Sequence, residues 1–303
     1  MSLHSRQTLV AESSGPVPSH VGRVLTYAVL LIGAVVSAIP FIYMVMTSLK
    51  SYGNIINNMI WPWPPFGSET FQFENYTEAI NRIGFDSQWH IPLFVRYFIN
   101  SLIVAAGTVA GVLVTSITAA YAFARIDLPG KNWIFLLLLV TVMVPQDLVL
   151  VPKAVMMFDL NWYNTYYALT IPFTVSVFGI FLLRQFFLQI PRDLYDAAQL
   201  DGAGHLRFLS AITLPLSRPA LVTVALLHFI WSWDDFKWPL LVTKDANMRL
   251  LAVGLQQFML GEGGTNVHLL MAGATMTVAP VLIFYFLAQK HFTIGVISTG
   301  MKG

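Results

Sequence analysis

Acidic residues inside long apolar stretches are the first candidates for chemistry in this sequence. Asp147 interrupts one such stretch, and Asp234 and Asp235 interrupt another. A charged side chain within a membrane span is energetically costly, so it usually faces a cavity or a partner and marks a functional site. With Trp233, which directly precedes the acidic pair, these carboxylates are predicted to line a solute pathway, because aromatic faces and carboxylates suit hydroxyl-rich ligands.

The depth of these carboxylates follows from helix geometry. Asp147 and Asp234 each lie about 15 residues into a predicted span, which at about 1.5 Å per residue places both roughly 22 Å from the inner boundary. Lys153 and Lys237 come later in the same spans, where they can snorkel to the surface or pair with the carboxylates. The same depth is near the edge of an apolar core of about 30 Å, so an aromatic belt with helix-end charges is the alternative interpretation.

Other catalytic or metal-binding chemistry finds no support in the sequence. Cysteine is absent, which excludes disulfides, thiolate metal ligands and cysteine nucleophiles. His228, His268 and His291 have no His or Glu partner at metal-ligand spacing, so no metal site is expected. The sequence has no Gly-x-x-x-x-Gly-Lys-Ser/Thr loop, so ATP and magnesium are expected on another subunit. This chain is therefore predicted to be neither an enzyme nor a cofactor-binding protein.

The composition is that of an integral membrane protein. Of 303 residues, 56% are hydrophobic and only 11% are charged, against about 25% charged in soluble domains. The formal net charge of +2 gives no indication of nucleic-acid binding. A helix needs about 20 apolar residues to cross a bilayer, and six stretches satisfy this, which predicts an all-α integral membrane bundle. These stretches are 24–49, 97–124, 132–158, 160–183, 219–243 and 265–289.

The orientation is predicted from the cations of the short loops. With six spans both chain ends lie on one side of the membrane. Arg125 and Lys131 bracket a tight hairpin, whereas its outer counterpart, 159–167, has no cation, which favours an inside location for both ends. The first stretch is too long for a signal-peptide core and is interpreted as an uncleaved helix. We expect a disordered cytoplasmic tail (1–22), a transmembrane domain (23–291) and a cytoplasmic C-terminal tail (292–303).

Two outer segments are long enough to have structure of their own. Residues 51–96 contain a run of alternating tryptophan and proline at 61–65 and have room for short interfacial helices. Residues 244–268 are rich in glycine at 261–264, so the tip of this segment is expected to be mobile. The sequence leaves open whether these segments are ordinary loops or contacts with a partner.

A hydrophilic loop, residues 191–216, connects the fourth and fifth predicted spans on the inner side. Pro191 suits the first position of a helix, and Asp193 and Asp196 lie where acidic side chains meet the positive end of the helix dipole. The pattern therefore predicts a first short helix on the cytoplasmic surface.

The second half of the 191–216 loop is predicted to be a second short helix. Gly202 and Gly204 should end the first helix, and the second should run from about His205 until Pro215 stops it. Such a helix–turn–helix suits docking into a partner's groove better than spanning a membrane or catalysis.

The residue order within this loop is distinctive. Asp196-Ala197-Ala198 is followed after three residues by Gly202 and after nine more by Ile212-x-Leu214-Pro215. This order resembles the EAA loop of ABC-importer permeases, with Asp196 where the family usually has Glu. In that family the loop forms the coupling helices that sit in a cleft of the cytoplasmic ATPase subunit. The resemblance assigns ATPase coupling to Asp196, Ala197, Ala198, Asp201, Gly202, Ala203, Gly204, Phe208, Leu214 and Pro215.

Further stretches resemble the MalG-like branch of these permeases, which serve oligosaccharide and related importers. They are 100–102, 119–125, 181–187, 233–240 and the C-terminal stretch 295–303. In that branch the C-terminal tail, which contains glycine, reaches into the ATPase dimer. The resemblance implies this role for Thr299, Gly300, Met301, Lys302 and Gly303, whereas the residues alone would suggest a frayed end.

The resemblance implies a permease subunit of the bacterial cytoplasmic (inner) membrane that forms half of the pathway for a sugar, oligosaccharide or related polyhydroxy solute. Implied partners are a second, homologous permease, two cytoplasmic ABC ATPase subunits, an extracytoplasmic solute-binding protein and membrane lipid. Maltose-like oligosaccharides, other glycans and glycerol phosphates are all carried within this branch, so the solute stays open. The alternative is an ion-coupled secondary transporter, but the sequence has no repeat between its halves and the 191–216 loop would have no role.

Overall fold

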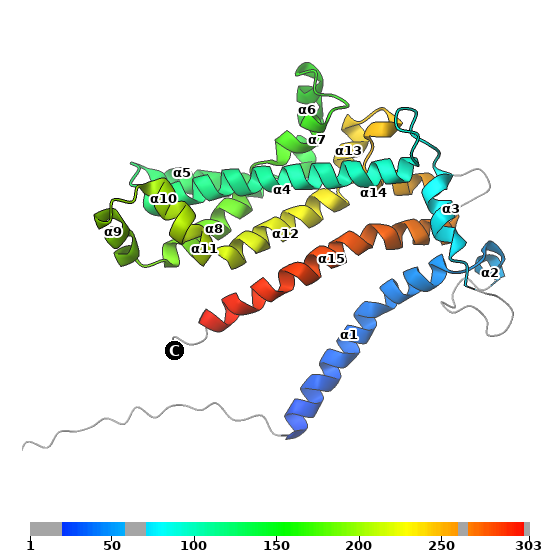
Figure 1. Cartoon of the computed structure of the whole chain (residues 1–303), viewed down its shortest axis with the longest axis horizontal. Helices are drawn as coiled ribbons and strands as arrows, with labels where there is room; N and C mark the ends of the chain where they lie inside the picture. Colours follow the sequence, from blue (N-terminus) through cyan, green and yellow to red (C-terminus); the bar gives the residue numbers. More distant parts are fainter. Residues whose placement is uncertain (1–19, 58–70, 260–265, 300–303) are drawn as a thin grey trace, which may run out of the picture.

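The computed structural model describes residues 20–57, 71–259 and 266–299, and the regular elements within them are helical (Figure 1). Three helices are long and apolar enough to cross a membrane, and three bent pairs of helices also qualify if each pair counts as one span. The described residues therefore contain between three and six candidate spans. The described residues do not include three stretches that the sequence singled out, which are 61–65, 261–264 and 300–303.

The three long helices form where apolar residues continue without a break for more than 20 positions. They are α1 (His20–Ser48), α4 (Leu93–Arg125) and α15 (Val267–Thr299). α4 packs against α8 (Val177–Gln189) and α12 (Arg218–Asp234), and α12 packs in turn against α15. Residues 292–299 continue α15, and residues 20–22 begin α1, so helix extends into the described part of both predicted tails.

The third predicted span, 132–158, is a bent pair of helices and not a single straight one. α5 (Lys131–Val140) and η1 (Thr141–Met143) are followed by α6 (Gln146–Asp159) at an angle of 96°. Pro145 has no N–H to donate and pushes the preceding Val144 into an extended conformation, which breaks the helix. α6 projects away from the bundle (Figure 1).

The fourth and fifth predicted spans are also interrupted. α7 (Tyr166–Thr170) and η2 (Ile171–Phe173) meet α8 at 43°, so the fourth span begins and ends about six residues later than predicted. α12 ends at Asp234, the chain is extended at Asp235, and α13 (Lys237–Val242) follows. The acidic pair therefore lies at a helix break and not within a continuous helix.

The 191–216 loop has the predicted helix–turn–helix geometry. It contains α9 (Arg192–Leu200), α10 (His205–Phe208), a π-helical segment η3 (Leu209–Thr213) and α11 (Leu214–Leu216). Gly202 has φ +78°, a conformation that residues with a Cβ rarely adopt, so it permits the tight turn after α9. Pro215 does not stop the second helix as predicted: it lies inside α11, and the chain bends by 79° into α12.

One end of the bundle is called the outer end after the predicted orientation, and the opposite end is called the inner end. The outer end carries the short helices expected in residues 51–96. They are α2 (Tyr52–Asn57) and α3 (Glu74–Arg82), next to η4 (Ala246–Met248), α14 (Leu251–Leu255) and η5 (Gln256–Phe258) of the segment before α15. α9 to α11 and the C-terminal end of α15 lie toward the opposite end of the molecule (Figure 1). The two ends are therefore built from different parts of the sequence.

Close packing joins α4, α8 and α12 in the middle of the bundle. A Cβ at Gly179 of α8 would lie 2.6 Å from Ser116 Oγ of α4 and 3.3 Å from Val224 Cγ1 of α12. Only glycine permits this approach. The three helices consequently form a closely packed core between the two ends of the bundle.

Candidate functional site

The 191–216 loop is fixed to the inner end of α4 by one histidine between two tyrosines. His205 Nδ1 lies 3.1 Å from the hydroxyl of Tyr121 on α4, and the Tyr195 hydroxyl lies 3.3 Å from the same ring. The Tyr195 ring also stacks on the His205 ring at 5.6 Å and meets Phe208 edge-on at 5.0 Å. The two short helices of the loop are thus held to each other and to α4 by the same aromatic group.

A second attachment lies at the entrance to the loop. The Arg125 guanidinium, on the last residue of α4, donates hydrogen bonds to the carbonyl oxygens of Phe187, at 2.9 Å, and Ile190. Carbonyls at a helix C-terminus have no partner within the helix, and a cation there also meets the negative end of the dipole. Arg125 therefore fixes the end of α8, from which the loop departs.

The residues predicted to couple to an ATPase fall into two groups. Ala198 and Phe208 are buried in the inner hydrophobic cluster and attach the loop to the bundle. Ala203 and Leu214 are half-buried against the same cluster. The others are exposed: Asp196, Ala197, Asp201, Gly202, Gly204 and Pro215.

Two leucines that the sequence did not single out are the most exposed apolar side chains of the loop. Leu200 is 90% exposed and Leu206 is 82% exposed, one on each side of the turn at Gly202. Their neighbours in the sequence are polar or charged: Gln199 and Asp201 flank Leu200, and His205 and Arg207 flank Leu206. Helical spacing from the buried Ala198 and Phe208 would have placed both leucines on the outward face.

The outer half of the structure contains a cavity of about 640 Å³ between α6, α8, α12 and α13. α4 contributes Val104 and Thr108 to its wall. The remaining lining includes four charged residues, four aromatic residues and a histidine: Asp147, Lys153, Asp235, Lys237, Phe173, Phe178, Trp231, Trp238 and His228. Aromatic faces beside groups that donate and accept hydrogen bonds can bind a ligand that has both C–H faces and hydroxyl groups.

The charges of the cavity are balanced. Lys237 Nζ lies 2.9 Å from Asp147 Oδ1, which confirms the predicted pairing of a lysine with an acidic residue. Lys153 Nζ lies 4.7 Å from the centre of the Phe173 ring and 5.6 Å from that of Trp238, in cation–π geometry. Asp235 Oδ1 accepts a hydrogen bond from the Trp238 backbone N–H at 3.3 Å. These two lysines and two aspartates therefore contribute a net charge of zero to the cavity wall.

Trp233 and Asp234 do not lie among the lining residues. Trp233 is 2% exposed, donates a hydrogen bond from Nε1 to the Thr277 carbonyl at 3.0 Å, and stacks on Phe229. It joins α12 to α15, while Trp231 faces the cavity. Asp234 is exposed at the end of α12. The sequence did not indicate which tryptophan faces inward, because neighbouring helices decide that.

The estimated depths also change with the structure. α6 leaves α5 at 96°, so Asp147 and Lys153, which both belong to α6, do not continue along the α5 axis from which their depths were estimated. Asp147 is in the first turn of α6. Asp147 and Lys237 meet because two separate helix breaks, at Pro145 and Asp235, bring α6 and α13 together.

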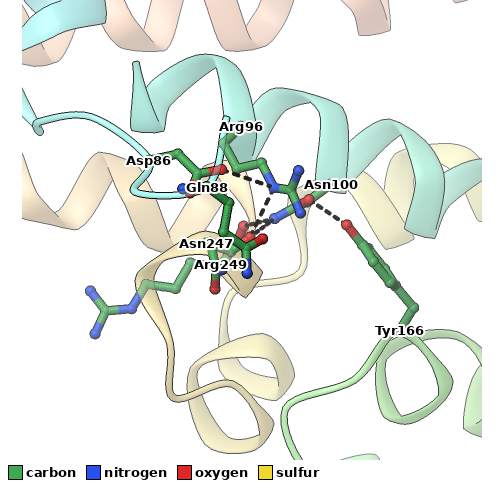
Figure 2. Close-up of polar contacts among 7 residues, drawn as sticks. All are labelled: Asp86, Gln88, Arg96, Asn100, Tyr166, Asn247 and Arg249. Carbon is green, nitrogen blue, oxygen red and sulfur yellow. Dashed lines mark hydrogen bonds and ion pairs between the residues drawn. The ribbon is translucent and has the colours of Figure 1, made fainter. Parts of the chain in front are cut away.

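The outer end of α4 holds a second polar network, which we call the outer clamp (Asp86, Arg96, Asn100, Tyr166 and the carbonyls of Asn247 and Arg249). Asn100 donates from Nδ2 to the Asn247 carbonyl at 2.8 Å and to the Arg249 carbonyl at 2.9 Å. Its Oδ1 accepts a hydrogen bond from the Tyr166 hydroxyl at 2.6 Å. Figure 2 shows the Asn100 side chain of α4 in contact with the segment that carries Asn247 and Arg249 and with Tyr166.

Arg96 and Asp86 complete the outer clamp. Arg96 Nε donates to the Asn247 carbonyl at 3.2 Å and lies 3.9 Å from Asp86 Oδ2 (Figure 2). Their side chains are only 8% and 0% exposed, so both charges are buried together. One turn further along α4, Ser101 Oγ accepts a hydrogen bond from the Leu251 N–H at 2.9 Å. The sequence singled out 100–102 by resemblance, and the structure gives these residues a structural role.

No metal centre is evident in residues 20–57, 71–259 and 266–299, where no group of three or more His, Asp or Glu residues is placed to hold an ion. Thr299 ends α15, and the remaining tail residues predicted to contact an ATPase lie outside the described part of the chain.

Comparison with known proteins connects this geometry to transport. The family model "Binding-protein-dependent transport system inner membrane component" matches residues 8–297. The arabinooligosaccharides transport system permease protein AraQ of Halalkalibacterium halodurans is 31% identical over 89% of this chain and 93% of its own length. The sn-glycerol-3-phosphate transport system permease protein UgpE of Agrobacterium fabrum is 31% identical over 92% of this chain and 97% of its own length.

Solved structures with similar helix arrangements come from a bacterial alginate ABC transporter. One chain, from the transporter involved in import of the acidic polysaccharide alginate, has a TM-score of 0.77 at 24% identity and covers 92% of this chain and 100% of its own length. Another, from the transporter in complex with an alginate pentasaccharide-bound periplasmic protein, has a TM-score of 0.58 at 14% identity and covers 87% of this chain and 92% of its own.

Proposed function

The chain belongs to the family of binding-protein-dependent transport system inner membrane components, and on this basis we propose that it forms half of the solute pathway of an ATP-driven importer. The family match confirms the resemblance predicted from the sequence, and the alginate transporter chain confirms the helical permease fold. As a member of this family it is a multi-pass, non-catalytic subunit of the inner membrane. We assign ATP hydrolysis, with bound ATP and magnesium, to separate partner subunits.

The exposed surface of the 191–216 loop is the observation that carries the ATP-driven part of the proposal. The loop is attached through buried aromatic residues and presents Leu200, Leu206 and the turn at Gly202 away from the bundle. Burial of an exposed leucine against another protein contributes roughly 1.5–3 kcal/mol, so two such leucines beside the turn would favour docking of a partner. The ten predicted coupling residues then divide into a contact surface and an attachment to the bundle.

The cavity supports a hydroxyl-rich solute. Its walls combine Trp231 and Trp238 with balanced charges, which suits ring faces and hydroxyl groups. Relatives named for arabinooligosaccharides and sn-glycerol-3-phosphate, and a solved chain from an alginate importer, all concern molecules rich in hydroxyl groups. We assign Asp147 and Asp235 to the pathway wall, Trp233 to its support, and Asp234 to the rim.

The proposed complex contains a second, homologous permease, two cytoplasmic ATPase subunits and an extracytoplasmic solute-binding protein. The alginate transporter solved with its periplasmic protein supports such a partner. We place both chain ends and the 191–216 loop inside the cell, which accords with the loop and the end of α15 lying toward one end of the molecule (Figure 1). In this arrangement the outer clamp faces the binding protein, and residues 299–303 reach the ATPase.

Uptake into proteoliposomes tests the proposal, with the transporter purified together with its partner subunits. The probes are labelled arabino-oligosaccharide, glycerol 3-phosphate and alginate oligosaccharide, each with the cognate binding protein. Uptake of one of these probes should require ATP hydrolysis and survive the collapse of proton and sodium gradients. Uptake that follows an ion gradient without ATP would instead establish the secondary-transporter alternative.

A substitution on the loop makes the test specific. Replacing Leu200 and Leu206 together with aspartate should prevent the ATPase subunits from co-purifying, because two charges would replace the apolar contacts. Leu128→Asp is the matched control, since Leu128 is 43% exposed in the hairpin between α4 and α5 but lies outside the loop. Equal co-purification from the double variant and the control would refute the assigned docking surface.

A further inference from the structure

α4 differs from the other helices around the cavity because it is continuous. It runs for 33 residues, roughly 50 Å at about 1.5 Å per residue, without an internal proline. The pairs α5–α6 and α7–α8 bend by 96° and 43°, and the chain bends by 79° where α11 meets α12. A displacement at one end of α4 can therefore reach the other end without being absorbed at a bend.

The inner end of α4 is joined to the 191–216 loop by side chains. Tyr121 is 4% exposed, and its ring meets His205 edge-on at 5.9 Å in addition to the contact between its hydroxyl group and Nδ1. His205 in turn contacts Tyr195 of α9, and Gln199 donates a hydrogen bond to the Tyr195 hydroxyl at 2.9 Å. The side-chain hydrogen bonds from the loop into α4 therefore pass through His205, beside the buried packing of Ala198 and Phe208.

The covalent route out of the loop is less rigid. The chain passes through the π-helical segment η3 and then bends by 79° at Ser217 before α12 begins. π-helical segments and sharp bends are common sites of hinge movement. A push on the loop would be partly absorbed there, whereas the contact with Tyr121 reaches α4 directly.

The outer end of α4 is joined to the wall of the cavity. Asn100 holds the carbonyls of Asn247 and Arg249, and the next residue, Leu250, lines the cavity. α4 also contributes Val104 to the same wall. Movement of α4 along or about its axis would consequently move the cavity wall.

We infer that α4 is the rigid lever that carries movement of the 191–216 loop to the outer cavity, and that His205 is the positioning residue joining the loop to it. The inference rests on the proposed ATP-driven function but adds a route and a specific joint. His205 touches neither solute nor nucleotide in this arrangement. Its role is to make the loop and α4 move together.

Distance measurements on the complex with its partner subunits test the lever. The chain has no cysteine, so spin labels can be attached to Ala246→Cys and Val151→Cys, both at exposed positions close in sequence to the cavity-lining Leu250 and Leu150. ATP with vanadate is the probe, and trapped nucleotide is measured in the same samples. The distance between the labels should change on trapping.

The variants at His205 separate positioning from folding. His205→Leu should lower about fivefold the ratio of trapped complexes that show the new distance to those that keep the resting distance, the equivalent of one lost hydrogen bond of about 1 kcal/mol. His205→Gln, which can still bond the Tyr121 hydroxyl, should restore most of it. Ser210→Ala is the matched control, because Ser210 Oγ bonds only carbonyls of its own segment among the described residues.

The results distinguish failure of the lever from failure of the proposed function. A full distance change in His205→Leu, or no difference between His205→Leu and His205→Gln, overturns the lever. If His205→Leu fails to assemble, Tyr121→Phe removes a single hydroxyl from the same contact, and a full distance change in that variant also overturns it. A wild-type complex that hydrolyses no ATP overturns the proposed function, and the inference with it.

Discussion

The inner and outer ends of this permease are stabilised in different ways. At the inner end, Tyr195, His205 and Phe208 lie within 14 residues of one another and hold the two short helices of the loop together. At the outer end, Asn100 meets Asn247 across 147 positions of sequence, and Lys237 meets Asp147 across 90. Contacts close in sequence hold the two short helices of the inner end to each other, although the contact of His205 with Tyr121 of α4 spans 84 positions. The contacts named here at the outer end all join distant segments.

This difference has a functional consequence. A local unit can move as one body when a partner pushes it, because its internal contacts do not depend on the rest of the fold. A region held by contacts between distant segments changes shape when any of its helices moves. The proposed ATPase side is therefore a rigid contact, and the proposed solute side is a deformable cavity.

The largest expected effect concerns the two tryptophans of α12. Trp233→Ala should destabilise the fold by about 3–5 kcal/mol, because it empties a buried site between α12, α15 and α4. Trp231→Ala should lower uptake with little loss of stability, since Trp231 is 55% exposed and faces the cavity. Thermal unfolding of the purified complex measures the first effect and uptake the second. Equal melting temperatures for the two variants would contradict the assignment of Trp233 to the core.

A smaller but still large effect is expected at the outer clamp. Asn100→Ala should cost about 2–3 kcal/mol, because two carbonyls and the Tyr166 hydroxyl would lose their partner in a buried site. Asn100→Asp should not rescue stability, since a carboxylate accepts from Tyr166 but cannot donate to the carbonyls of Asn247 and Arg249. Melting temperatures of the two variants check this, and recovery in Asn100→Asp would show that the clamp does not act through those carbonyls.

At the inner end the expected effect is on coupling and not on folding. Gly202→Trp should reduce uptake per ATP hydrolysed by about tenfold, since a side chain would stand in the docking surface and the turn would be strained by about 1–2 kcal/mol. The control is Gly130→Trp, because Gly130 has φ +74° and, like Gly202, open space where a Cβ would lie, but belongs to another hairpin. Similar losses in both variants would attribute the effect to backbone strain alone.

The smallest expected effect on stability belongs to the ion pair of the cavity. Lys237 and Asp147 are 66% and 72% exposed, so the pair should contribute less than about 1 kcal/mol to folding. Lys237→Met should nevertheless lower uptake, because it leaves Asp147 without its partner in the cavity wall. Exchanging the two residues, Lys237→Asp with Asp147→Lys, should recover part of the uptake. A double variant as poor as the single one would indicate that the position of each charge matters and not only their pairing.

Much of the inner end was predictable from the sequence. The prolines, glycines and acidic residues of residues 191–216 predicted a helix–turn–helix, and their order indicated the family. These signals are local, since capping, helix breaking and small-residue spacing act within a few positions. The continuation of the second helix through Pro215 was not predicted, because the π-helical segment before it depends on how the loop packs.

The outer site was only partly predictable. Asp147 and Asp235 were correctly singled out as charged residues in apolar stretches, and both lie on the cavity wall. Trp233 was predicted to line the pathway, whereas the structure has Trp231 on the cavity wall, and α6 bends away from α5 by 96°. In each case the sequence reports hydrophobicity and charge, but the direction of a side chain after a helix break is set by the neighbouring helices.

The sequence by itself determined that this chain is helical, resides in a membrane and carries a loop typical of importer permeases. Composition and local spacing decide those properties, because a bilayer requires apolar helices and a tight turn requires glycine. The tertiary structure alone decided which charges pair, which tryptophan faces the cavity, and that α4 links both ends. Those features depend on contacts between residues far apart in the chain, which form only when the broken spans close around a continuous helix.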